Sequence, residues 1–184
     1  MFKHVAQSLA VLALSACASL NPLTLYHLSQ LSPLEADPAD FTVAIDVPNG
    51  ASIEPGSATL GLSAIRGNET IGAEYALASI NGNPIDLPPP KGRYNLYRIA
   101  DTDLAAIRAT QAKARLWEAE DPDGTQGSLS AGLKPCTLGD GPAKDAAVAI
   151  QLRITPGGPF LPLVKSMSLR QVVGADIKPC NSER

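Results

Sequence analysis

The chain has 184 residues, enough for one domain with a sizeable core and too few for two ordinary domains. Its 16 prolines and 15 glycines stand against only 4% aromatic residues, which favours a β-rich fold with many turns. The formal net charge of −3 and the lack of a polybasic segment argue against nucleic acid as a partner and against attachment to anionic headgroups by charge.

The first 17 residues have the pattern of an export signal. Residues 1–4 form a short, positively charged segment, and residues 5–14 are mostly apolar. The apolar stretch is well below the roughly 20 residues that a permanent membrane-spanning helix needs. It leads into Leu14-Ser15-Ala16-Cys17, which resembles the lipobox of bacterial lipoproteins: an aliphatic residue, two small residues and an obligatory cysteine.

The resemblance implies that the Cys17 sulfur receives a diacylglyceryl group, that a peptidase cleaves just before this residue, and that the new amino terminus is acylated, with palmitate as the expected fatty acid. Ala18 and Ser19 follow, with no aspartate directly after the cysteine, which resembles the outer-membrane signal of enteric bacteria. A plain secretory signal, or a buried apolar segment with a chance cysteine, is the alternative.

This interpretation divides the chain into three parts: a signal peptide over 1–16, a lipidated amino terminus and tether over 17–40, and one β-rich globular domain over 41–184. Prolines punctuate the tether and leucines recur along it, so part of it is expected to lie against the domain or to form a short helical turn. The prolines are Pro22, Pro33 and Pro38, and the leucines include Leu20, Leu23, Leu25, Leu28 and Leu31.

Once Cys17 is assigned to lipid, Cys136 and Cys180 remain as a pair. In an oxidising periplasm such a pair predicts a disulfide, which would close a loop of roughly 45 residues. The chain-entropy relation gives about 4 kcal/mol for a loop of that size. A redox or metal role is the alternative, but the sequence offers neither a C-x-x-C motif nor a nearby histidine.

Four strands are expected in the first half of the domain, because apolar residues alternate with polar ones between turn residues. The expected strands are 41–47, 57–65, 71–77 and 94–99. The run Pro88-Pro89-Pro90-Lys91-Gly92 between the last two cannot be a central strand, since proline supplies no amide donor to a sheet. It is expected to be an extended surface loop.

One helix is expected over 101–119, with Asp101 or Thr102 as its cap and Asp103 at its positive end. Its apolar residues recur near helical spacing, and its charged residues are expected on a solvated face. The turn sequence Asp121-Pro122-Asp123-Gly124 ends it. The apolar residues are Leu104, Ile107, Ala114 and Trp117, and the charged ones Arg108, Lys113 and Arg115.

Three further strands are expected over 128–133, 148–154 and 167–173. About seven short strands separated by turns predict a mainly β fold, either a β-sandwich or a partly open barrel, with the helix near 101–119 packed on it.

The sequence shows no catalytic, metal or cofactor motif. His27 in the tether is the one histidine of the mature chain, so a catalytic triad has no base in the domain. Gly127 to Gly132 lacks the G-x-S-x-G spacing of a nucleophile elbow and is better interpreted as a small-residue strand. Asp121 to Gly124 lacks the remaining ligands of a calcium loop and is better interpreted as a turn.

The segment from Phe160 to Val164 is the most apolar one outside the signal. It predicts an exposed contact patch or a loop leading into a core strand with proline on a sheet edge. The loop is the favoured interpretation. These observations favour a lipid-anchored, non-enzymatic interaction or accessory module of the bacterial envelope. Its expected partners are the membrane and an envelope protein. A binding protein for a small or lipidic ligand is the alternative. An envelope hydrolase with paired carboxylates is a third hypothesis.

Overall fold

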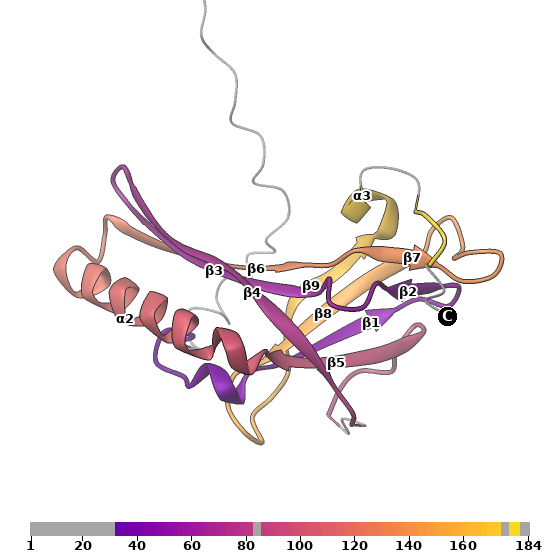
Figure 1. Cartoon of the computed structure of the whole chain (residues 1–184), viewed down its shortest axis with the longest axis horizontal. Coiled ribbons are helices and arrows are strands. Elements are labelled where there is room, and N and C mark those ends of the chain that lie inside the picture. The colour runs from indigo at the N-terminus through magenta and orange to yellow at the C-terminus, as the bar shows by residue number, and fades with distance from the viewer. Residues whose placement is uncertain (1–31, 83–85, 174–176, 181–184) are drawn as a thin grey trace, which may run out of the picture.

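The computed structural model describes residues 32–82, 86–173 and 177–180. Its main feature is a nearly closed antiparallel sheet of seven strands in the order β6-β3-β4-β5-β1-β8-β9, with β2 and β7 forming a separate small sheet (Figure 1). The strands are β1 Thr42–Val47, β2 Ala51–Ile53, β3 Thr59–Arg66, β4 Glu69–Ile80, β5 Arg93–Ile99, β6 Thr125–Gly132, β7 Pro135–Thr137, β8 Ala147–Arg153 and β9 Leu161–Ser168.

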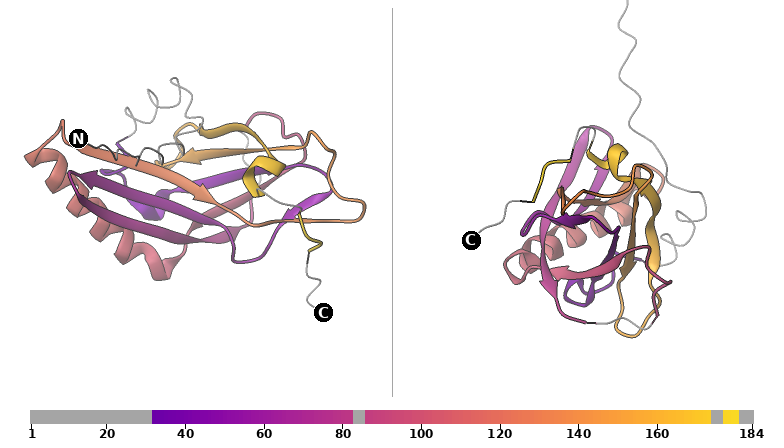
Figure 2. Two further views of the ribbon diagram at one scale, coloured as in Figure 1. Left: turned by 90° about the horizontal axis from the view of Figure 1, so that it is seen from above. Right: turned by 90° about the vertical axis from the view of Figure 1, so that its right-hand side faces the viewer.

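One long helix accompanies this sheet, so the predicted mainly β fold with one inserted helix is confirmed. The helical elements are the 3-10 turns η1 Pro38–Asp40 and η2 Asp101–Asp103, the helix α2 Leu104–Glu120 and the short helix α3 Leu169–Val173. Figures 1 and 2 show α2 running along the hairpin of β3 and β4, which extends beyond the rest of the sheet.

The larger of two clusters of buried apolar side chains, drawn from most strands, fills the interior of the sheet. β1 is an inner strand of the sheet, between β5 and β8, and all six residues of β1 are buried. The alternation in this segment predicts one polar face, yet even Asp46 is only 4% exposed. Its carboxylate accepts hydrogen bonds from the amides of Lys91 (2.8 Å) and Gly92 (3.2 Å) and so fixes the end of the proline-rich segment. That segment is a surface loop, as predicted.

The helix α2 has the predicted buried side. Ile107, Ala114 and Trp117 are at most 2% exposed, and the guanidinium of Arg66 lies 4.8 Å from the Trp117 ring centre. Trp117 and Ala114 form a second buried cluster with Ala64 of β3. The helix therefore lies on the core-facing side of the β3–β4 hairpin.

The predicted cap of α2 is wrong. A 3-10 turn over Asp101–Asp103 precedes the helix, so Asp103 becomes its N-cap and makes no side-chain capping bond. The Asp103 carboxylate accepts instead from the amide of Ala76 at 2.7 Å, while Asp101 pairs with Arg98. The side chains that suit a cap are used to fix the helix to β4 and β5.

The predicted strand over 167–173 is also wrong. The strand β9 begins at Leu161, ends at Ser168 and is followed by α3. The turn at 156–158 folds β9 back on β8 with Leu161 opposite Leu152, and this pairing exhausts the partner strand at Ala147. Leu169 is buried as the pattern suggested, but as the first residue of a helix.

The small sheet of β2 and β7 is absent from the predicted elements, because three residues are too few to display alternation. Gly50 precedes β2 with a φ of +80°, and a Cβ there would lie 2.3 Å from the Gly141 carbonyl oxygen. The chain can therefore make this close approach only with glycine.

Candidate functional site

Cys17, the predicted lipidation site, and His27, the one histidine of the predicted mature chain, both lie outside the described residues. The structure does describe residues 32–40, the end of the expected tether, and they lie against α2. The 3-10 turn η1 falls in this segment, as the sequence predicted, and Pro38 is buried. The contacts of these residues therefore show how the amino-terminal segment is joined to the domain.

Gln111 of α2 makes the central contact with this segment. Its side chain is 2% exposed, and its Nε2 donates to the carbonyl oxygens of Pro33 (2.8 Å) and Ala36 (2.9 Å). Because both amide hydrogens have main-chain acceptors, this buried polar group is satisfied as a donor. Leu34, between the two acceptors, packs against the cluster around Trp117.

Two arginines flank Gln111 on α2. Arg115 donates to the carbonyl oxygen of Leu34, and Arg108 donates to the Asp37 carboxylate at 2.8 Å. The Ala39 amide and the Arg108 guanidinium lower the pKa of Asp37 below its ordinary value of 3.8. We call this set the tether clamp: Arg108, Gln111 and Arg115 of α2 with residues 33–37.

The helical pattern predicts that Arg108 and Arg115 lie on a solvated face and does not distinguish Gln111 from other polar residues. The signal available was the spacing of the three residues, which puts them along one side of the helix. Nothing in the sequence says that main-chain carbonyls of residues 33–36 lie opposite, because those carbonyls carry no residue-specific pattern.

The predicted disulfide between Cys136 and Cys180 is present, with an S–S distance of 2.05 Å. It joins β7 to the residues near the carboxyl end, where Thr137 donates its amide to the Lys178 carbonyl (2.8 Å) and accepts from the Cys180 amide (3.0 Å). Residues 177–180 thus add an extended segment beside β7.

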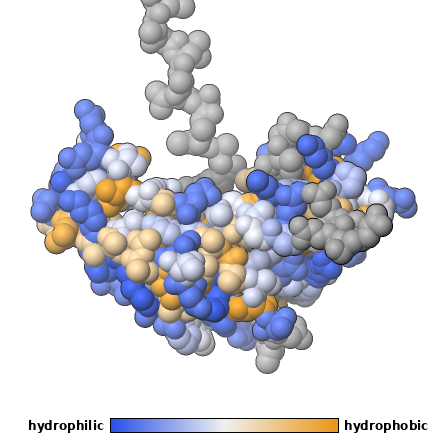
Figure 3. Space-filling model, in the orientation of Figure 1, coloured by the Kyte–Doolittle hydropathy of each residue, from blue (hydrophilic) through white to orange (hydrophobic). Residues whose placement is uncertain are grey.

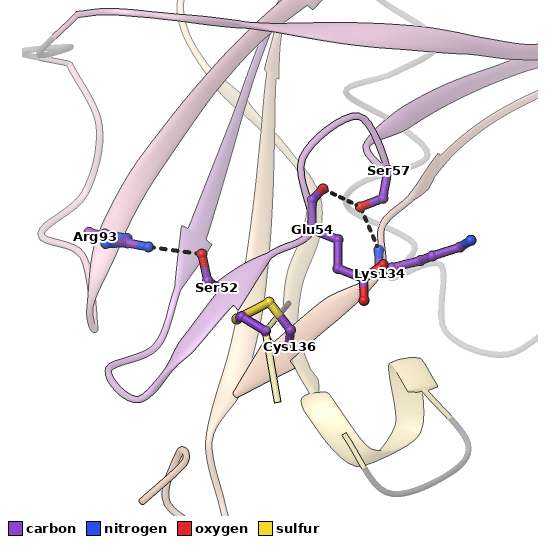
Figure 4. The surroundings of a disulfide bond; sticks show 7 residues. Ser52, Glu54, Ser57, Arg93, Lys134 and Cys136 are labelled. Atoms are coloured by element: carbon purple, nitrogen blue, oxygen red, sulfur yellow. Dashed lines mark hydrogen bonds between the residues drawn. A yellow bond between two sulfur atoms is a disulfide. The ribbon is translucent and has the colours of Figure 1, made fainter. Parts of the chain in front are cut away.

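Polar contacts surround the disulfide (Figure 4). The Ser57 hydroxyl donates to the Glu54 carbonyl at 2.7 Å and accepts from the Lys134 amide at 3.2 Å. Arg93 donates to the Ser52 hydroxyl at 3.1 Å. These bonds close the loops around β2 and β7 and bring together no base and nucleophile, so the surroundings are those of a structural disulfide.

The two segments that only partly match a calcium loop and a nucleophile elbow are local structure, as predicted. Asp121 accepts from the amide of Gly124 at 3.0 Å, in the turn that ends α2. The stretch from Gly127 to Gly132 lies in β6, as the small-residue interpretation predicted. Within the described ranges, no group of three or more histidine, cysteine, aspartate or glutamate residues is arranged to hold a metal ion.

The apolar segment from Phe160 to Val164 enters β9, with Pro162 on this edge strand of the sheet. Leu163 is 5% exposed and belongs to the core, while Val164 packs on it half-buried. The segment is therefore the start of β9 itself and not a loop leading into a strand, whereas the predicted proline on a sheet edge is confirmed. Among the described residues, the most exposed large apolar side chain is instead Leu116 of α2, at 59%. Figure 3 shows pale and orange atoms among blue ones in the region of this helix.

Comparison with protein-family models, with curated proteins and with solved structures finds no match to this chain. Among the described residues, no helix combines the length and apolar character required to span a membrane.

Proposed function

We propose that this chain is a lipid-anchored protein of the bacterial envelope, held through Cys17 at the outer membrane and facing the periplasm, whose β-domain is a non-enzymatic interaction module. The observation that carries the proposal is the sequence Leu14-Ser15-Ala16-Cys17 after a charged start and a short apolar run. Two or three acyl chains on one residue anchor stably, whereas a single chain binds reversibly.

Two structural features support this proposal. The disulfide between Cys136 and Cys180 fits an oxidising compartment. The tether clamp holds residues 33–37 on α2, so a pull on an amino-terminal anchor would reach a well-packed helix. Tyr75 of β4 meets Thr110 of α2 with 2.6 Å between their hydroxyl oxygens, which connects that helix in turn to the sheet.

The test of anchoring is mass spectrometry of the mature amino terminus from cells that express the full chain. We expect a first residue at Cys17 carrying a diacylglyceryl group and an amide-linked fatty acid. Cys17→Ala should remove lipid labelling and prevent cleavage before residue 17, while the matched variant Ser19→Ala should leave both unchanged. An unmodified Cys17 in the mature chain, or cleavage elsewhere, would refute the anchor.

Separation of inner and outer membranes tests the proposed location at the outer membrane. The wild-type chain should co-fractionate with the outer membrane in an enteric host, and Ala18→Asp should move it to the inner membrane because aspartate then follows the lipidated cysteine. If the wild-type chain is found in the inner membrane, the proposed location is wrong even though the anchor stands.

The interaction role is tested by crosslinking intact envelopes and recovering the chain under denaturing conditions. We expect the same envelope protein in repeated experiments and its loss in the Cys17→Ala variant. Recovery of no consistent protein would count against an interaction module.

A further inference from the structure

The two edge strands of the seven-stranded sheet differ sharply. An edge strand presents unpaired main-chain groups, and proteins usually protect it with proline, charge or irregular pairing. β9 has all three: Pro162 and Lys165 lie within it, and its pairing with β8 shifts register twice between Val148 and Gln151. This edge is poorly suited to receive another strand.

β6, the opposite edge, has none of these protections. Its sequence from Thr125 to Gly132 contains neither proline nor charge, and it pairs with β3 in unbroken register over its whole length. In the part of the chain that the structure describes, β3 is the only strand with which β6 pairs. One row of its main-chain donors and acceptors therefore suits a further extended strand.

The side chains of β6 determine what such a strand would meet. Leu129 and Ala131 point toward the core and remain half-buried, whereas Ser128 and Ser130 on the opposite face are exposed. A strand paired with β6 would therefore lie beside small polar side chains on the outer face of the sheet and beside the exposed part of Leu129 on the core-facing side.

We propose that β6 pairs antiparallel with β6 of a second copy of this chain, about a two-fold axis at Leu129. In this register Leu129 lies opposite Leu129 of the other copy, so the half-buried leucines cover each other. Ser128 of one copy lies opposite Ser130 of the other on the outer face, and the uncharged strand brings no like charges together.

Charges at the two ends of β6 support this occupant. Asp121 and Asp123 precede the strand and Lys134 follows it, and Asp121, Asp123 and Lys134 are exposed. Antiparallel pairing about Leu129 places Lys134 of each copy opposite Gly124 of the other, next to Asp123. The pair therefore gains the same favourable charge contact twice, once at each end.

Site-directed crosslinking of the full chain in intact cells tests this pairing. In the Leu129→Cys variant the two introduced thiols would be about 5 Å apart, as for directly opposite residues. A short bismaleimide should then give a species of twice the chain mass. Gln126→Cys is the matched control on the same strand. Its two copies would be about 20 Å apart along the strands, so it should give only the wild-type background.

A second pair of variants tests whether the Leu129→Cys crosslink depends on the edge of β6. Ser128→Lys puts a charge on the exposed face of the edge and should reduce the Leu129→Cys crosslink about tenfold or more. Thr70→Lys adds the same charge at an exposed position of β4, away from this edge, and should leave the crosslink within about twofold of its starting level.

A crosslink of equal yield at residues 126 and 129, or none at residue 129, would overturn the proposal. Crosslinking of residue 129 to a protein of different mass would also overturn it and would assign β6 to another partner. The readout uses total cell protein and an oxidation-independent reagent. Failure of the lipid anchor would therefore appear in fractionation and leave this crosslink unchanged.

Discussion

The two ends of the described chain are fixed by opposite chemistry. Residues 33–37 are held on α2 by side-chain hydrogen bonds from Gln111, Arg108 and Arg115. Residues 177–180 are held on β7 by the disulfide between Cys136 and Cys180 and by two main-chain hydrogen bonds. One attachment is non-covalent and local to a helix, and the other is covalent and closes a long loop.

The attachments of the two ends therefore respond to different conditions. The carboxyl-terminal attachment depends on oxidation, whereas the tether clamp depends on a buried amide and on the charge of Asp37. Each should therefore fail without the other. The end nearest the proposed anchor is the one that can detach without breaking a covalent bond.

The largest expected effect on stability follows loss of the disulfide. Reduction, or the double variant Cys136→Ser with Cys180→Ser, should lower the free energy of unfolding by about 4 kcal/mol, because the unfolded chain regains the entropy of an open loop. Urea unfolding with and without reductant measures it. The double variant should show no further effect of reductant, and equal stability of the oxidised and reduced wild-type chain would contradict the prediction.

Gln111→Ala should have the next largest effect. It removes the donor to the Pro33 and Ala36 carbonyls and leaves a cavity, so we expect a loss of about 2 to 3 kcal/mol in unfolding free energy. Hydrogen exchange should rise more in residues 33–40 than at β7. The exposed neighbour Lys113→Ala should change stability by less than about 0.5 kcal/mol. Equal effects of these two variants would mean that the clamp contributes nothing.

The smallest effect concerns pH. Since the folded state lowers the pKa of Asp37, its contribution is present above the ordinary value of 3.8 and is lost as pH falls through the lower folded value. Protection of residues 33–40 from hydrogen exchange, taken relative to the intrinsic exchange rate at each pH, should therefore fall in acid, and Asp37→Asn should flatten that dependence.

Asp101 provides the control, since the pKa of Asp101 is likewise lowered, here by hydrogen bonding and charge from Arg98. Asp101→Asn should leave exchange of residues 33–40 as in the wild type. If it alters that exchange as much as Asp37→Asn does, the acid response belongs to the whole domain and not to the clamp.

Sequence pattern was most informative where one side of an element is buried and its length allows several repeats. The strands β1, β3, β4, β5 and β8 and the helix α2 were all expected near their observed positions. The pattern was misleading at β9, because Met167 and Leu169 belong to a strand end and a helix start that happen to be two residues apart. It was silent on β2 and β7, which are too short to repeat.

By itself the sequence determined the β-rich class, the long helix, the pairing of Cys136 with Cys180 and the resemblance to a lipobox that motivates the proposed anchor. All four rest on residue identity or on periodicity along the chain. Only the tertiary structure decided that Gln111 holds residues 33–36, that Asp46 holds the proline-rich loop and that β6 is the unprotected edge. Those facts depend on main-chain groups and on strand order, which bring together atoms far apart in sequence and leave no mark in the identity of the residues that carry them.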